Sequence, residues 1–376
     1  MSDPDGPVAR WTEVGTEWGA LPVLADMQGA YPDPPLVIWL NNFEQPRPRW
    51  TAADTSWRYL QNHGAGTSDE DKRRFFGDGW VQRDGALWAA LAGELTTPWQ
   101  EASIPVCYTA FGRSKYGLWS GWGNSSLHIP GRFAPWPLAV NGSPSYYVFA
   151  DAATHNETDY TVNSPQVAGM NWNFQLDEAL TYNPDQFWEV SVYDGGTQRW
   201  AWYRFDQGQV WDTARYRGYV RFALWQSRPR ILREFRLAGQ DRAPYVPYWE
   251  ELLEAVQEVH ADPDLTRFWR HGELVPNNAF PHPYQTALVA AYTDADVTRN
   301  YLLEADANPV RPWTNSTELA VFALAYVLGE APDREWLLFA YAPLAHQDNT
   351  TITLPGYGDV TVDVPRGAGD FWVFGE

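Results

Sequence analysis

Six short runs of consecutive apolar residues constrain the fold of this chain more than any other feature. Continuous apolar runs are typical of strands buried on both faces, whereas half-exposed strands alternate apolar and polar residues. The segment from Asp69 to Ala92, between the first two runs, instead spaces its aromatic and leucine residues as a helix does. Strand, helix and strand in repetition predict a parallel sheet or a β/α barrel. The six runs are 36–40, 104–110, 146–150, 166–170, 187–192 and 219–225, and 22–26 is a weaker seventh.

The predicted fold class is α/β, with residues 1–275 forming a (β/α)8-type TIM barrel, because such barrels typically need about 250 residues. Only 35 residues precede the first strong strand, so either the early strands are compressed into that segment or the barrel is incomplete at its N-terminal side. An incomplete barrel leaves parallel strand edges uncovered, and these invite pairing with a second copy of the chain.

A second domain is predicted for residues 276–376. A helix with one apolar face is expected at 248–260, and the proline-rich stretch 275–283 then ends the barrel pattern. Short strands separated by turn residues follow, a pattern that predicts an all-β sandwich. These strands are 285–293, 297–304, 319–328, 336–342, 350–354, 360–364 and 371–374.

Aromatic residues make up 16% of the chain, which has 22 tryptophans and 20 tyrosines. Such rings pack in cores or bind ligands. Three tryptophans lie beside Gly, Asn or Arg rather than in apolar runs, and we expect at least one of them to line an open groove and stack on a sugar face. They are Trp122, Trp172, which follows Asn171, and Trp200.

Charge and composition exclude several classes of function. The formal net charge of -20 repels phosphate backbones, so nucleic acid is not expected as a partner. Cys107 is the single cysteine, and the seven histidines lack zinc-site spacing, so neither a disulfide framework, a metal nor a cofactor is expected. The sequence has no signal-peptide pattern and no run long enough to span a membrane. A soluble protein is expected, and cytoplasmic and secreted locations both stay open.

Two strand-like runs end near a glutamate. Leu36 to Leu40 leads into Asn-Asn-Phe-Glu44, and Glu189 lies inside the run 187–192. Cleavage of a glycosidic bond needs one carboxylic acid to protonate the leaving oxygen and a second carboxylate to attack the sugar. Glu44 and Glu189 are therefore the candidate catalytic pair, although Glu44 could instead pair with Arg47 or Arg49 in a surface loop.

Further candidate substrate-binding residues follow other strands. Asp151 and His155 belong to an acidic loop that could bind substrate or a cation. Tyr193 precedes Asp194-Gly-Gly, a turn sequence, and Trp225 closes the last apolar run. The segment 228–236, with four arginines and Glu234, could grip an anionic sugar or form structural ion pairs.

This layout resembles that of the clan A retaining glycoside hydrolases. In that superfamily the acid/base glutamate follows an asparagine at the end of the fourth barrel strand, and the nucleophile ends the seventh. The resemblance implies that Glu44, preceded by Asn42 with Phe43 between them, is the acid/base and that Glu189 is the nucleophile. It implies a glycosidase of carbohydrate metabolism with an oligo- or polysaccharide substrate. The alternative is a glycan-binding or assembly protein on a scaffold that has lost catalysis.

Overall fold

The fold is described from a computed structural model, which covers residues 8–41, 53–107, 139–141, 186–190, 213–229, 231–234, 246–279, 298–303, 321–342 and 345–376. Contacts divide the chain into two compact units. Unit 1 consists of residues 1–143 and 182–187, and unit 2 of residues 144–181 and 188–376. This division falls before the proline-rich stretch at 275–283, so unit 2 includes helices as well as the C-terminal strands.

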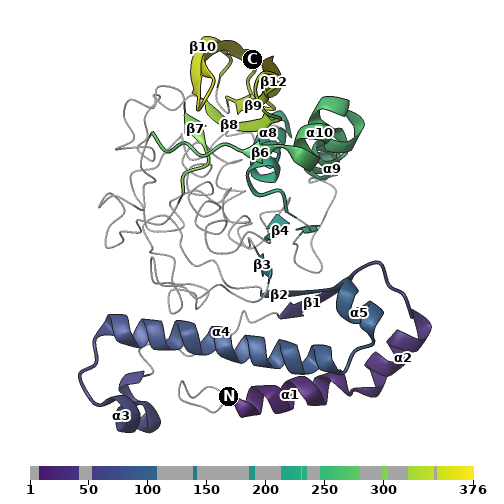
Figure 1. Cartoon of the computed structure of the whole chain (residues 1–376), viewed down its shortest axis with the longest axis vertical. Coiled ribbons are helices and arrows are strands. Elements are labelled where there is room, and N and C mark those ends of the chain that lie inside the picture. Colours follow the sequence, from purple (N-terminus) through teal and green to yellow (C-terminus); the bar gives the residue numbers. More distant parts are fainter. Residues whose placement is uncertain are drawn as a thin grey trace. The chain divides into compact units, whose positions relative to one another are not determined.

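Unit 1 contains five described helices: α1 (Ala9–Gly19), α2 (Pro22–Ala30), α3 (Trp57–His63), α4 (Asp69–Gly93) and α5 (Thr97–Ala102). Helix α1 lies alongside the long helix α4 (Figure 1). Gly15 and Gly19 allow this approach, because a Cβ on Gly15 would lie 2.2 Å from the Leu87 carbonyl oxygen and one on Gly19 2.6 Å from the Glu94 Cβ. Small residues thus let the two backbones pack closely.

The helix predicted at 69–92 is confirmed as α4. Ser68 caps it: its side-chain oxygen accepts a hydrogen bond from the backbone N–H of Asp71 at 3.1 Å. Near its other end, Leu91 joins Leu95 and Trp99 in an apolar cluster, against which Val37 and Trp39 pack. The helices therefore cover one face of the strand that contains Val37 and Trp39.

A five-stranded sheet follows the chain in order, β1-β2-β3-β4-β5. Its strands are β1 (Val37–Asn41), β2 (Ser103–Cys107), β3 (Ala139–Asn141), β4 (Gln186–Val190) and β5 (Ile231–Glu234). The pairings β1 with β2, β2 with β3 and β3 with β4 are parallel. Three of the predicted apolar runs thus supply β1, β2 and β4.

Unit 2 holds a second sheet, antiparallel in its described pairings, with the order β12-β9-β8-β6 and β7 paired to β8. These strands are β6 (Glu273–Leu274), β7 (Leu302–Leu303), β8 (Phe322–Leu328), β9 (Glu335–Tyr341) and β12 (Asp370–Gly375). A hairpin, β10 (Gln347–Leu354) with β11 (Gly358–Val364), forms a separate two-stranded sheet.

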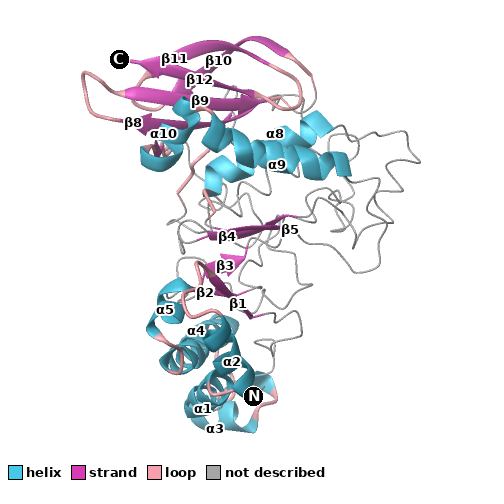
Figure 2. Cartoon of the chain, turned by 90° about the vertical axis from the view of Figure 1, so that its right-hand side faces the viewer, coloured by secondary structure: helices cyan, strands magenta, loops and turns pink. Residues whose placement is uncertain are grey.

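The central strands of this second sheet are buried on both faces. The hairpin packs its apolar side on one face, where Ile352 and Val362 meet Leu338. Helix α8 (Thr213–Ser227) packs on the other face, where Phe222 contacts Phe339 (Figure 2). Burial on both faces explains why β8 and β9 are continuous apolar runs. Helices α9 (Val246–Ala261) and α10 (Pro263–His271) complete the described part of unit 2.

Two segments predicted as strands are helices. The weak strand at 22–26 is the start of α2, because proline suits the first position of a helix and the alanine, methionine and glutamine that follow favour helix. The run 219–225 belongs to α8. Its residues 222–225 are all at most 4% exposed, so the helix is buried on most sides and shows no 3.6-residue pattern.

Within the described part of the predicted strand 297–304, residues 298–301 are not strand and only Leu302–Leu303 forms one, β7. The runs at 319–328, 336–342, 350–354, 360–364 and 371–374 are confirmed as β8, β9, β10, β11 and β12. The helix predicted at 248–260 is confirmed as α9. The runs at 146–150, 166–170 and 285–293 lie outside the described residues.

Candidate functional site

The carboxyl ends of β1 to β4 lie at one edge of the parallel sheet. Asn41, the last residue of β1, is paired with Cys107, the last residue of β2, and Asn141 at the end of β3 is paired with Phe187 in β4. In parallel α/β folds the loops leaving this edge carry the active site. The residues that follow these strands are therefore the first candidates for chemistry.

Both predicted catalytic glutamates relate to this edge through the sequence. Glu189 is the fourth of the five residues of β4, two residues beyond Phe187. The described part of β4 is its backbone, and the Glu189 side chain lies outside the described part of the chain. Glu44 lies outside the described residues, three positions after the last residue of β1.

Sheet geometry sets a condition on this pair. In a flat sheet, three strand-to-strand steps of about 4.8 Å place β4 about 14 Å from β1. A retaining glycosidase needs its two carboxyl groups about 5 Å apart, and an inverting one about 6.5 to 9.5 Å. The two glutamates can therefore act together only if the sheet curls, as in a barrel, and if both side chains point to its inside.

Most of the predicted substrate-binding residues lie outside the described residues. These are Asn42, Trp122, Asp151, His155, Asn171, Trp172, Tyr193 and Trp200.

Trp225 is described, and its surroundings do not fit the predicted role. The side chain is 1% exposed and packs edge-on against Trp269 and Tyr326, with ring centroids 5.2 and 5.3 Å apart. The Tyr326 hydroxyl donates to the Trp225 carbonyl, and burial raises the pKa of Tyr326, an effect that the charge of Arg228 only partly offsets. Trp225 offers no ring face on which a sugar could stack, because it forms part of the core beneath β8.

Arg228, which begins the arginine-rich segment, has a structural role. Its guanidinium donates to the carbonyl oxygens of Trp269 and Gly272, at 3.2 and 2.7 Å, and lies 5.0 Å from the centre of the Tyr326 ring. The guanidinium therefore binds carbonyl oxygens at the C-terminal end of α10, which is a structural role and not the binding of an anionic sugar. Arg233 and Glu234 belong to β5, which is described by its backbone.

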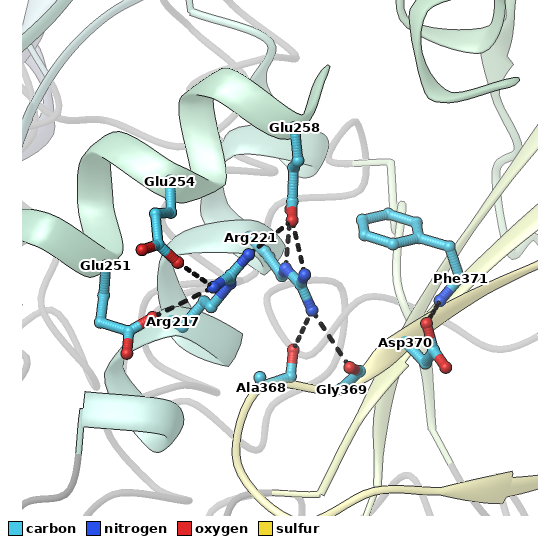
Figure 3. Close-up of polar contacts among 9 residues, drawn as sticks. All are labelled: Arg217, Arg221, Glu251, Glu254, Glu258, Ala368, Gly369, Asp370 and Phe371. Carbon is cyan, nitrogen blue, oxygen red and sulfur yellow. Dashed lines mark hydrogen bonds and ion pairs between the residues drawn. The ribbon is translucent and has the colours of Figure 1, made fainter. Parts of the chain in front are cut away.

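A charged cluster between α8 and α9 was not predicted from the sequence (Figure 3). Arg217 donates to Glu254 at 2.5 Å and to Glu258 at 3.0 Å, with Glu251 at 3.4 Å. Burial lowers the pKa of Arg217, but the hydrogen bond that Arg217 donates to Glu258 and the three carboxylate charges outweigh it, so the pKa is raised overall. The signal in the sequence is the spacing: arginines four residues apart on one helix and glutamates three and four apart on the other.

Arg221 extends this cluster to the β-sheet of unit 2. It makes a two-point contact with Glu258, at 2.7 and 2.5 Å, and donates to the carbonyl oxygens of Ala368 and Gly369 at 3.0 and 3.1 Å. A Cβ at Gly369 would lie 2.4 Å from the Ala340 carbonyl, and Gly369 has a φ of +68°. The donors of Arg221 are thus used to fix the chain just before β12, which leaves the cluster a structural part of unit 2 rather than a catalytic one.

The described residues contain no group of three or more His, Cys, Asp or Glu side chains that could hold a metal ion. No helix among them combines the length and apolar character needed to cross a bilayer.

No protein-family model matches this chain, and neither does any curated protein or solved structure with which it was compared. The residues of the chain itself therefore carry the functional proposal.

Proposed function

We propose that the chain is a glycoside hydrolase that cleaves an oligo- or polysaccharide with two carboxylates. Glu189 is the nucleophile and Glu44 the general acid and base. The observation that carries the proposal is the parallel pairing from β1 to β4, because it brings the strand before Glu44 and the strand containing Glu189 to a common carboxyl edge. The aromatic content of the chain supports a sugar as the substrate.

The proposed fold for this activity is a β/α barrel or part of one. Its support is the strand order, which follows the chain without reversal. A doubly wound sheet reverses its order at the ligand site, whereas a barrel winds in one direction. Continued winding in one direction also supplies the curvature that the distance between the two carboxylates requires.

A non-catalytic glycan-binding or assembly protein is the second candidate. The observation that favours it concerns β1, which has β2 as its only described neighbour. Leu36 is 47% exposed and Ile38 43% exposed, on the face opposite Val37 and Trp39. Parallel sheets are usually covered by helices on both faces, so this exposed face of β1 suits contact with a ligand or with another chain.

Turnover separates these two candidates. The full chain is incubated with aryl glycosides and with oligosaccharides of the common hexoses and pentoses, and released sugar is measured. We expect hydrolysis, and we expect Glu189→Gln to lower kcat on the order of 1,000-fold or more because the nucleophile is lost. Glu13→Gln, a change on the exposed surface of α1, is the control and should keep activity.

Glu44→Gln tests the other role. The acid protonates the leaving oxygen, so its loss should slow substrates with poor leaving groups far more than activated aryl glycosides. Equal losses on both kinds of substrate would contradict the assignment of Glu44. Absence of turnover with sugar binding retained would favour the second candidate.

A further inference from the structure

We propose that Tyr357 and its neighbours form a saccharide-binding platform in unit 2, separate from the residues assigned to catalysis. Tyr357 lies in the turn between β10 and β11 and is 38% exposed. The choice of a sugar as ligand rests on the proposed function. The platform itself rests on the geometry around this ring.

The Tyr357 ring packs against two other aromatic rings. Its centroid lies 5.0 Å from that of Trp336 and 5.8 Å from that of Phe374. Trp336 and Phe374 are cross-strand partners on β9 and β12, and Trp336 is only 2% exposed. Tyr357 is therefore supported on one side by the core, and its exposed part faces away from that support.

Tyr357 lies between two glycines, which add no side chain beside its ring. A Cβ added to Gly356 or Gly358 would meet no atom within 4 Å, and both residues have positive φ values, +83° and +123°. A larger residue at either place would be strained, and its side chain would stand beside the ring. The turn thus presents a supported aromatic ring to solvent.

Two charged side chains lie near Trp336, the ring that packs against Tyr357. Arg334 places its guanidinium carbon 5.5 Å from the centre of the Trp336 ring, which also supports Tyr357. Its nearest carboxylate, that of Glu376, is 3.8 Å away, and both side chains are 35% exposed. Within the described part of the chain, no side-chain hydrogen bond engages either of them. Planar donors and acceptors beside an aromatic face suit a pyranose, whose C–H face stacks while its hydroxyls form hydrogen bonds.

The ligand that fits best is an oligosaccharide of β-linked pyranoses with equatorial hydroxyls. Equatorial substitution leaves flat C–H faces, which a single exposed ring can contact. Aromatic stacking also tolerates different sugars, since it reads the face of the ring rather than a pattern of hydrogen bonds.

The test counts binding sites per chain by calorimetry with cellohexaose and xylohexaose. The full chain carries Glu189→Gln, so that no probe is consumed. Tyr357→Leu keeps an apolar contact with Trp336 but removes the flat face, and Tyr357→Phe keeps that face. With at least one probe, we expect the leucine variant to lose one site per chain and the phenylalanine variant to bind within about threefold of the parent.

Val373→Ala is the matched control. Val373 is similarly exposed, at 39%, and is the neighbour of Phe374 on β12, so its side chain points to the opposite face. It should leave the number of sites unchanged. If Tyr357→Leu lowers the melting temperature, Glu376→Gln decides instead, because it leaves the ring in place and should weaken binding at the same site.

An unchanged number of sites in the leucine variant, or no binding of any probe, would overturn the platform. The proposed function is judged separately by turnover. Hydrolysis without a Tyr357-dependent site leaves that function standing, whereas a Tyr357-dependent site without hydrolysis supports the platform alone.

Discussion

The side chain of Arg221 links helices α8 and α9 to the segment just before β12 in unit 2. Its side chain is 12% exposed, and it joins Glu258 on α9 to two backbone carbonyls just before β12. Replacing it by methionine leaves those carbonyls and part of the Glu258 carboxylate without donors in a buried place. We expect Arg221→Met to lower the free energy of unfolding of unit 2 by about 3 kcal/mol.

Urea unfolding followed by tryptophan fluorescence measures this loss. Arg10→Met is the control, because Arg10 pairs with Glu13 on an exposed surface of α1 and should change stability little. A loss at Arg221 no larger than that at Arg10 would show that the cluster in Figure 3 does not hold the helices to the sheet.

Glu335 gives the stability of unit 2 a dependence on pH. The hydrogen bond from Arg267 lowers the pKa of Glu335 below its ordinary value of 4.5 and outweighs the opposing effect of burial. A lowered folded-state pKa contributes stability that is present above the unfolded value and is lost as pH falls through the folded value. The side chain is 34% exposed, so solvent screening limits this contribution to about 0.5 kcal/mol.

The comparison of the native chain with Glu335→Gln checks this sign. The native chain should be the more stable of the two at pH 7, and the difference should shrink once the pH falls below about 4.5. A difference of the same size at pH 7 and pH 3 would mean that the carboxylate charge is not involved.

At the scale of elements, the packing of α1 on α4 depends on the absence of side chains at two glycines. Gly15→Ala adds a Cβ that would lie 2.2 Å from the Leu87 carbonyl oxygen. Overpacking of this kind costs about 1 to 3 kcal/mol, more than alanine gains as a better helix former. We expect the variant to lower the melting temperature of unit 1 by several degrees.

Gly29→Ala is the matched control, because a Cβ at this position of α2 meets no atom within 4 Å. It should raise stability slightly, by up to about 1 kcal/mol. Equal effects of the two substitutions in a thermal melt would indicate that α1 and α4 are not closely packed.

The elements also show what the sequence can predict. Strands β8 to β12 are predicted to within three residues of their ends, because each is a short apolar or alternating run between turn residues. The run 219–225 is read as a strand and is helical in α8, since a helix buried on most sides loses its periodicity. The glycine contacts of α1 and the charged cluster of Arg217 depend on which helices become neighbours, which a local pattern does not contain.

The sequence also predicts only part of the candidate site. The sequence predicts that β1 and β4 belong to a parallel sheet, and the structure shows that β2 and β3 are the strands between them. Trp225 is assigned to the substrate because it closes an apolar run, yet burial in α8 makes it a core residue. The exposed ring of Tyr357 is missed, because a tyrosine between two glycines reads as an ordinary turn.

For the whole molecule, the net charge of -20 predicts how stability responds to salt. Like charges repel one another in the compact state, and salt screens that repulsion. We expect the melting temperature to rise by several degrees between about 0.05 and 1 M KCl. A falling melting temperature would mean instead that attractive ion pairs dominate, since salt weakens those as well.

The central claim is that Glu189 attacks the sugar, and trapping of the covalent intermediate tests it most directly. Activated 2-deoxy-2-fluoro glycosides form the glycosyl-enzyme and then hydrolyse slowly, so the adduct accumulates on the nucleophile of a retaining enzyme. The native chain is treated with the gluco, galacto, manno and xylo compounds, and the labelled peptide is identified by mass spectrometry. A single sugar on Glu189 is the result we predict, with none on the Glu189→Gln variant. An adduct on another residue, or hydrolysis of natural sugars with no adduct from any of the four compounds, would contradict the assignment.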